Sequence, residues 1–314
     1  MPIALRLPPF VAEGVVGLLA DTAFTVSQTY RRKQAEGIAL HGRCFHSVCW
    51  GAMVDRQVFS PETISADARA ALRSKLTFGR PDDFLLVYAG RISAEKGLDF
   101  CVELLRQTKI KHLCFAIIGA GPQEAAFAVL HGQRLGKADN MVHCVPEFVG
   151  QPQVAAAYCA ADAYFTGSEF ETLGFGAIEA MSCGAPALCP AAQGFQDTVD
   201  HRVTGYLYRP RSVDDCEACL MKLMEGHEID PVAVLKAGEH MTIAGCAARA
   251  IIVYGDALVI NKERSLLVRV AVIALLIPLA IVAGVVQLCL YYTGLSYAVE
   301  EGSRWYAYSP VLLT

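Results

Sequence analysis

Residues 168–181 read Ser-Glu-Phe-Glu-Thr-Leu-Gly-Phe-Gly-Ala-Ile-Glu-Ala-Met, and this stretch decides how the rest of the chain is interpreted. The short apolar run before it, Ala163–Thr166, is typical of a buried strand, and the pattern after it predicts an amphipathic helix that ends near Gly184. The stretch is therefore a predicted strand–loop–helix turn. It carries one glutamate in the loop, Glu171, and a second, Glu179, two helical turns further on.

The two glutamates suit a ligand that carries hydroxyl groups. Carboxylates at the mouth of such a turn can hold sugar hydroxyls, because each carboxylate oxygen accepts hydrogen bonds. The backbone N–H groups of residues 173–176 would form a helix N-terminus, which attracts anions. A capped helix with solvated acids is the alternative for either glutamate alone, but the whole stretch taken with the upstream motifs favours a ligand site.

A second motif, Gly90-Arg91-Ile92-Ser93-Ala94-Glu95-Lys96-Gly97, follows a predicted strand over 84–89. In open α/β sheets, ligands bind beyond the carboxyl ends of the strands, so Arg91 and Lys96 would lie on that rim. A guanidinium fork and an ammonium group together suit a diphosphate. A solvated strand end is the alternative, and the pair of glutamates about eighty residues later favours the diphosphate.

The region from residue 84 to residue 224 alternates between short apolar runs and amphipathic segments. This pattern predicts an α/β domain with a doubly wound parallel sheet covered on both faces. The predicted strands are 84–89, 113–118, 141–145, 163–166, 185–189 and 205–208. The predicted helices are 98–107, 122–135, 152–160, 175–183, 195–199 and 213–224. Residues 62–82 are polar and helical, which suggests a surface linker.

Taken together, the two motifs resemble the donor site of retaining family 4 glycosyltransferases of the GT-B fold. The wording Glu-Thr-Leu-Gly-Phe at 171–175 is similar to that of plant and algal sulfoquinovosyltransferases. The resemblance implies a Rossmann-like C-terminal domain of a GT-B enzyme. It further implies a nucleoside diphosphate sugar such as a UDP-sugar as the donor, transfer with retention, no metal or other cofactor, and a lipid acceptor such as diacylglycerol.

The resemblance also implies roles for individual residues. Arg91 and Lys96 would hold the donor diphosphate, Glu171 would contact the sugar and Glu179 the ribose. Catalysis would then depend on Glu171, Arg91 and Lys96. The full set of donor-binding residues expected on this basis is Gly90, Arg91, Lys96, Pro146, Phe148, Glu171, Thr172, Leu173, Gly174, Phe175 and Glu179.

Three further stretches fit the resemblance more loosely. Gly119-Ala120-Gly121-Pro122 is expected to be architectural, and it lacks the third glycine of a dinucleotide-binding motif. The turn at 193–197, Gln-Gly-Phe-Gln-Asp, departs from the family's Gly-Gly start and is interpreted as packing and pocket wall. Residues 48–59 resemble the segment that joins the two domains of these enzymes.

Composition excludes other classes of function. The net charge of −4 comes without a basic patch, so nucleic acid is not an expected partner. The 12 cysteines follow no disulfide-like spacing, and the lone pair Cys216 and Cys219 is interpreted as core. The carboxylate pairs Asp82-Asp83 and Asp214-Asp215 lie near element starts, where N-capping explains them without a metal.

Val270–Val286 is a run of seventeen uninterrupted apolar residues, and it predicts a single transmembrane helix over 266–292. A buried core helix is the alternative. Basic residues precede the run and acidic residues follow it, namely Lys262, Arg264 and Arg269 before it and Glu300 and Glu301 after it. This asymmetry predicts a single-pass membrane protein whose donor domain lies on the cytosolic or stromal side.

The resulting domain plan has five parts. Residues 1–61 would be a remnant of an N-terminal domain with the interdomain segment, and 62–230 the nucleotide-sugar-binding domain. Residues 231–265 would be a helical connector, 266–292 the membrane helix and 293–314 a tail. Only about eighty residues precede the Arg91 strand. We therefore expect a fragment, a partner that supplies a separate N-terminal half, or a membrane-anchored protein that binds nucleotide sugar without turnover.

Overall fold

The computed structural model describes residues 24–25, 27–29, 48–49, 54–237, 239–263, 270 and 274. The chain divides into two units. The larger comprises Val26–Thr29 and Gly51–Cys246, and the smaller comprises Met1–Thr25, Tyr30–Trp50 and Ala247–Thr314. In the smaller unit, β1 (Phe24–Thr25) pairs in parallel with β2 (Val48–Cys49).

The larger unit is built on a seven-stranded sheet whose order is β5-β6-β4-β3-β7-β8-β9. All neighbouring strands are parallel except β5 and β6, which are antiparallel. All six residues of β4 are buried, as expected for a strand covered on both faces. The predicted doubly wound α/β sheet is confirmed. The strands are β3 (Phe84–Ala89), β4 (Leu113–Ile118), β5 (Arg134–Leu135), β6 (Asn140–Val145), β7 (Ala163–Phe165), β8 (Ala187–Pro190) and β9 (Gly205–Tyr208).

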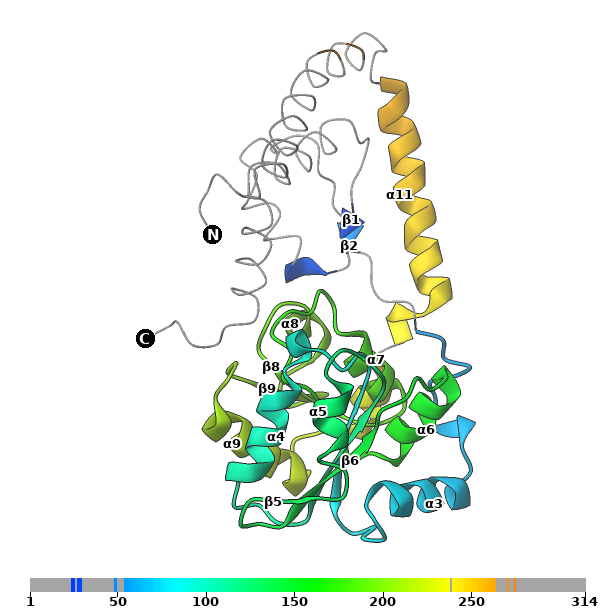
Figure 1. Ribbon diagram of the computed structural model, residues 1–314. Helices are drawn as coiled ribbons and strands as arrows, with labels where there is room; N and C mark the ends of the chain where they lie inside the picture. Colours follow the sequence, from blue (N-terminus) through cyan, green and yellow to red (C-terminus); the bar gives the residue numbers. More distant parts are fainter. Residues whose placement is uncertain are drawn as a thin grey trace. The chain divides into compact units, whose positions relative to one another are not determined.

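Helices pack on the sheet in two groups (Figure 1). In one group α4 contacts α9, and in the other α3 contacts α6, α6 contacts α7, and α7 contacts α10. The helices are α3 (Ala66–Leu76), α4 (Leu98–Gln107), α5 (Glu124–Ala128), α6 (Gln151–Ala160), α7 (Phe175–Ser182), α8 (Phe195–Thr198), α9 (Val213–Glu225), α10 (Pro231–Lys236) and α11 (Ile243–Glu263). Short 3-10 turns lie at η1 (Pro61–Thr63), η2 (Ala94–Lys96) and η3 (Glu239–Met241).

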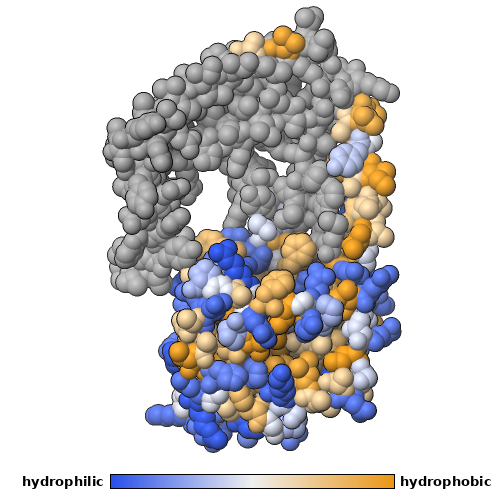
Figure 2. Space-filling model, turned by 45° about the vertical axis from the view of Figure 1, so that its right-hand side comes forward, coloured by the Kyte–Doolittle hydropathy of each residue, from blue (hydrophilic) through white to orange (hydrophobic). Residues whose placement is uncertain are grey.

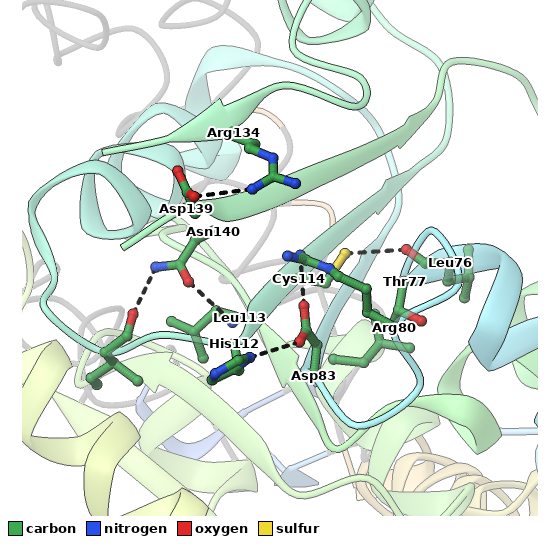
Figure 3. Close-up of polar contacts among 12 residues, drawn as sticks. Leu76, Thr77, Arg80, Asp83, His112, Leu113, Cys114, Arg134, Asp139 and Asn140 are labelled. Carbon is green, nitrogen blue, oxygen red and sulfur yellow. Dashed lines mark hydrogen bonds and ion pairs between the residues drawn. The ribbon is translucent and has the colours of Figure 1, made fainter. Parts of the chain in front are cut away.

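The amino ends of the central strands are held by buried polar side chains (Figure 3). The carboxylate of Asp83 lies 2.6 Å from the Arg80 guanidinium and 3.3 Å from the His112 ring. The buried side chain of Asn140 accepts a hydrogen bond of 3.1 Å from the Leu113 N–H. These contacts stabilise the end of the sheet from which the strands start, and they leave the carboxyl ends available for a ligand.

The predicted helix over 122–135 was too long, since α5 ends at Ala128. The Gly132 N–H donates to the Val142 carbonyl oxygen at 2.9 Å, and Gly132 has a φ of +72°, so the chain turns onto β6 instead of continuing the helix. Most of the stretch 62–82, expected to be polar, helical and on the surface, forms α3, in which only Leu76 is buried. Arg73 on α3 donates to the Ala160 carbonyl oxygen at 2.8 Å and pairs with Asp162, which attaches α3 to the sheet.

The predicted membrane helix over 266–292 lies outside the described residues, apart from 270 and 274. Within the described part of the chain, no helix is long and apolar enough to cross a bilayer. The helix α11 carries exposed apolar residues, and its surface is largely orange in Figure 2. Ile251 is 70% exposed and Leu258 64% exposed.

Candidate functional site

The candidate site lies where the strand order of the sheet reverses. From β3 the chain adds β4 and β6 on one side, and it then returns to add β7 and β8 on the other. The strands β3 and β7 pair in parallel, with Val87 opposite Tyr164, so their carboxyl ends are adjacent. Such a switch point forms a crevice where open α/β sheets bind ligands. Both motifs from the sequence, the loop at 90–97 and the loop at 166–174, are brought to this crevice.

The two loops touch backbone to backbone at a pair of glycines, Gly97 and Gly167. A Cβ atom on Gly97 would lie 2.3 Å from the Gly167 carbonyl oxygen, and a Cβ on Gly167 would lie 2.2 Å from the Gly97 carbonyl oxygen. No side chain fits at either position. Gly97 also has a φ of +61°, a left-handed conformation that favours glycine. The absence of two side chains thus allows the loops to approach this closely.

Hydroxyl groups hold the two loops in register. The buried Ser168 hydroxyl donates to the Glu95 carbonyl oxygen at 3.1 Å, and the Thr166 hydroxyl donates to the Lys96 carbonyl oxygen at 3.3 Å. The Tyr208 hydroxyl donates to the Thr166 carbonyl oxygen at 2.6 Å, which ties this end of β7 to β9. The turn that carries Lys96 is therefore attached at two carbonyl groups to the loop that carries the first glutamate.

Lys96 and Glu171 form an ion pair across the junction of the loops. The Lys96 Nζ lies 2.8 Å from the Glu171 Oε2, and the two side chains are 24% and 20% exposed. A cation and a carboxylate at this depth attract each other more strongly than on an open surface, because less water screens them. The pair that the sequence placed about eighty residues apart is thus in direct contact.

Arg91 is positioned by a buried tyrosine. The Tyr88 hydroxyl donates to the Arg91 carbonyl oxygen at 2.8 Å, and a Cβ on Gly90 would lie only 2.9 Å from that hydroxyl oxygen. Burial raises the pKa of Tyr88 far above its ordinary value, so the hydroxyl stays a donor. The side chain of Arg91 is exposed, and it forms no ion pair with any described residue. It is therefore accessible to an anion at the rim of the sheet.

The N-terminus of α7 faces the same loops. Its N-cap is Gly174, with a φ of +91°, and a Cβ there would lie 2.7 Å from the buried Phe195 ring. The Gly194 N–H donates to the Glu171 carbonyl oxygen at 2.9 Å, so the turn before α8 supports this loop. The first N–H groups of a helix have no partner within the helix, and the N–H of Phe175 is available to an anion.

Glu179 lies on the second turn of α7 and is partly buried. Burial raises the pKa of its carboxyl group from 4.5 to about 7. Among the described residues, no hydrogen bond or ion pair is formed by this carboxyl group. A partly buried carboxyl group without a partner, close to a ligand crevice, is a candidate binding group.

A sequence profile of the family described as glycosyl transferases group 1 matches residues 73–237, which is more than half of the chain. The protein belongs to this family. The match covers the whole crevice, from the strand that precedes Arg91 to the helix that follows the last strand of the sheet. The resemblance stated from the two motifs is thereby confirmed.

Curated members of the family are similar over part of their length. A sulfoquinovosyl transferase of Arabidopsis thaliana is 31% identical over 185 residues, which is 57% of this chain and 33% of that protein. A D-inositol 3-phosphate glycosyltransferase of Xylanimonas cellulosilytica is 33% identical over 158 residues, which is 49% of this chain and 37% of that protein. The chain thus spans between a third and two fifths of the length of these two relatives.

Solved structures share the fold at lower identity. HepE from Anabaena, solved in complex with UDP and glucose, superposes with a TM-score of 0.64 at 17% identity, covering 79% of this chain and 67% of that chain. A sucrose-phosphate synthase from Thermosynechococcus elongatus superposes with a TM-score of 0.62 at 22% identity. The match covers 80% of this chain and 61% of that chain. At these identities the likeness shows the GT-B type of fold.

Pro146 and Phe148 lie apart from the other predicted donor residues. Both are exposed in the loop after β6, with Phe148 90% exposed. The strand β4 separates β6 from β3 in the sheet, so this loop follows a strand that is not adjacent to β3. The expected contact of Pro146 and Phe148 with the donor stays a prediction. Thr172 is exposed, whereas Leu173 is buried, so the Leu173 side chain is not open to a ligand.

Several supporting residues were not found from the sequence. Gly167, Ser168 and Thr166 lie within or beside the quoted motif, but no chemistry was assigned to them. Each loop carries one of the two glycines, Gly97 and Gly167, but no local signal in the sequence indicates that they meet. The architectural role expected for Gly119 agrees with the structure, where its Cβ would lie 2.0 Å from the Gly90 carbonyl oxygen.

The described part of the chain contains no group of three or more histidine, cysteine, aspartate or glutamate residues that could hold a metal ion. The carboxylates of Asp214 and Asp215 lie in the first turn of α9, where the Asp215 side chain accepts a hydrogen bond from the Arg209 N–H at 2.6 Å. The side chains of Cys216 and Cys219 are buried in the core.

Proposed function

We propose that this protein binds a UDP-sugar and supplies the donor half of a retaining glycosyl transfer to an acceptor, with a lipid such as diacylglycerol as the favoured acceptor. The observation that carries the proposal is the Lys96–Glu171 pair at the switch point of the sheet, 2.8 Å apart, beside Arg91 and the N-terminus of α7. The lipid acceptor is supported by the similarity to the Arabidopsis sulfoquinovosyl transferase.

Each group has a chemical task in this proposal. Arg91 and Lys96 bind the diphosphate and, with the free N–H groups of α7, stabilise the negative charge that develops on it as it leaves. Glu171 accepts hydrogen bonds from sugar hydroxyls, and Glu179 accepts them from the ribose. The protein holds the leaving group with its own cations, so the proposed mechanism requires no metal.

An alternative proposal is a membrane-anchored protein that binds nucleotide sugar without transferring it. One observation favours it. The site groups found in the described part of the chain, Arg91, Lys96, Glu171 and Glu179, are all assigned to the donor and none to the acceptor. Positioning of the acceptor lowers the barrier to transfer by several kcal/mol. A chain without groups that position the acceptor would therefore bind the donor without rapid transfer. Transfer of radiolabelled sugar from UDP-sulfoquinovose or UDP-glucose to diacylglycerol separates the two proposals. The assay is run with the chain alone and with an added N-terminal half from a family member.

We expect Arg91→Ala to lower the affinity for UDP-glucose by about 10- to 30-fold, because the variant loses a charged hydrogen bond to the diphosphate. Isothermal titration calorimetry with UDP and UDP-glucose measures this. Arg134→Ala is the matched control, because Arg134 pairs with Asp139 at the opposite end of the sheet (Figure 3). An Arg91→Ala variant that binds both ligands as tightly as the wild type contradicts the diphosphate site.

We also propose that residues 266–292 form a single membrane span with the donor domain on the cytosolic or stromal side. The support is the apolar run and its basic flank in the sequence. Deletion of residues 266–314 is expected to release the protein from membranes washed with carbonate. Release of the full chain by the same wash would contradict the span.

A further inference from the structure

The ion pair in the candidate site joins two groups that the proposed function assigns to two parts of the ligand. Lys96 is assigned to the diphosphate and Glu171 to the sugar, yet Nζ and Oε2 are 2.8 Å apart. Each charged group therefore satisfies the other. A ligand that takes Lys96 has to break or weaken this contact, and the carboxylate of Glu171 then loses its cation.

The two loops are tied together, so they cannot easily move apart to let a ligand bind Lys96 without disturbing the ion pair. Gly97 and Gly167 are in backbone contact, and the hydroxyls of Ser168 and Thr166 bind the carbonyl groups of the turn that carries Lys96. The backbone positions of the two charged residues are thus fixed relative to each other. Any rearrangement on ligand binding is confined to the two side chains.

We propose that the Lys96–Glu171 ion pair makes the site selective for a nucleoside diphosphate that carries a sugar over the nucleoside diphosphate alone. This inference rests on the proposed function. When a diphosphate oxygen binds Lys96, the carboxylate of Glu171 is left partly buried with one partner fewer, which carries a free-energy cost. Sugar hydroxyls donate hydrogen bonds to that carboxylate and offset the cost. UDP lacks the transferred sugar, so nothing offsets this cost and Glu171 competes with UDP for Lys96.

The same competition has a consequence after transfer. The UDP product lacks the hydroxyls that compensated Glu171, so the carboxylate takes Lys96 back and weakens the hold on the product. A single carboxylate thereby favours the substrate over the product, and Glu171 is a specificity-determining residue as well as a contact to the sugar.

Calorimetry on the full chain with UDP and with UDP-glucose tests the competition. We expect Glu171→Gln to bind UDP about threefold more tightly, the size of a partly exposed ion pair. We expect it to bind UDP-glucose about tenfold more weakly, because hydrogen bonds to a charged acceptor are lost. In the Lys96→Gln background, Glu171→Gln should no longer increase the affinity for UDP. If the role of Glu171 were purely structural, Glu171→Gln would lower the affinity for both ligands together.

Glu169→Gln is the matched control. Glu169 lies two residues earlier in the same loop, and its carboxylate pairs with the Arg211 guanidinium at 2.5 Å. The variant removes a paired carboxylate of the same loop while leaving Lys96 occupied, so both affinities should stay within about twofold. Thermal unfolding of each variant shows whether it is folded as the wild type is.

The UDP measurement decides between the outcomes. If the wild type binds UDP and Glu171→Gln binds it no more tightly, the competition is overturned while the proposed function stands. If the tightening persists in the Lys96→Gln background, the competition is also overturned, because it does not act through Lys96. If the wild type binds neither UDP nor UDP-glucose, the proposed function fails, and the inference fails with it.

Discussion

Gly167→Ala is expected to destabilise the protein by about 3 kcal/mol, in the range of severe overpacking, and to abolish measurable binding of UDP-glucose. The new Cβ would lie 2.2 Å from the Gly97 carbonyl oxygen and 3.0 Å from its carbonyl carbon. Both atoms belong to the backbone, so no side chain can turn aside. The turn that carries Lys96 would have to move, and the Lys96–Glu171 contact would be lost with it.

Thermal unfolding and calorimetry with UDP-glucose measure the two effects. Gly255→Ala, on α11, is the matched control, because no described residue outside the helix's own backbone lies within 4 Å of its new Cβ and its φ is not in the left-handed region. In a helix this change should be neutral or stabilising by up to about 1 kcal/mol. If Gly167→Ala unfolds at the wild-type temperature and binds UDP-glucose within about twofold, the two loops are not held by this contact.

The sheet was predictable from the sequence because its strands are continuous apolar runs. β3, β4 and β9 have the predicted bounds, and the strand predicted over 185–189 is observed at Ala187–Pro190. The helix over 122–135 was mispredicted, since its pattern is apolar enough for a helix but the Gly132 N–H is taken by β6. A hydrogen bond to a strand that follows in the sequence is a tertiary effect that local periodicity does not reveal.

For the site, the location of the charged residues in loops after the strands was predictable, but the Lys96–Glu171 contact was not. The motifs identified Arg91, Lys96 and Glu171 as rim residues, because polar side chains after buried strands lie at one edge of a parallel sheet. That Lys96 would pair with Glu171 depends on β3 and β7 being neighbours. Strand order follows from the helix crossovers and their packing, and neither motif contains that information.

Glu179→Gln is expected to make the protein more stable above neutral pH and a weaker binder of nucleotide. Burial raises the pKa of the Glu179 carboxyl group from 4.5 to about 7, so between these values the folded protein holds a proton that the unfolded chain has released. The folded state is therefore favoured at low pH, and this contribution is lost as the pH rises through about 7. Its upper bound is about 3 kcal/mol.

Because glutamine has no proton to lose, the variant should keep at pH 8 the stability that the wild type shows at pH 4.5. The difference in melting temperature between variant and wild type is expected to be large at pH 8 and to vanish near pH 4.5. Glu225→Gln, an exposed carboxylate at the end of α9, is the control and should show no such pH-dependent difference.

The same substitution has the opposite effect on binding, since a carboxylate is a stronger acceptor for two ribose hydroxyls than an amide. Affinity for both UDP and UDP-glucose should fall by about tenfold at pH 8, and in the wild type it should rise as Glu179 ionises between pH 6 and 8. A binding site that retains a costly buried carboxylate trades stability for affinity. If Glu179→Gln gains stability at pH 8 with no loss of affinity for UDP, the carboxylate does not contact the nucleotide. If it gains no stability at pH 8, burial does not raise the pKa of the Glu179 carboxyl group.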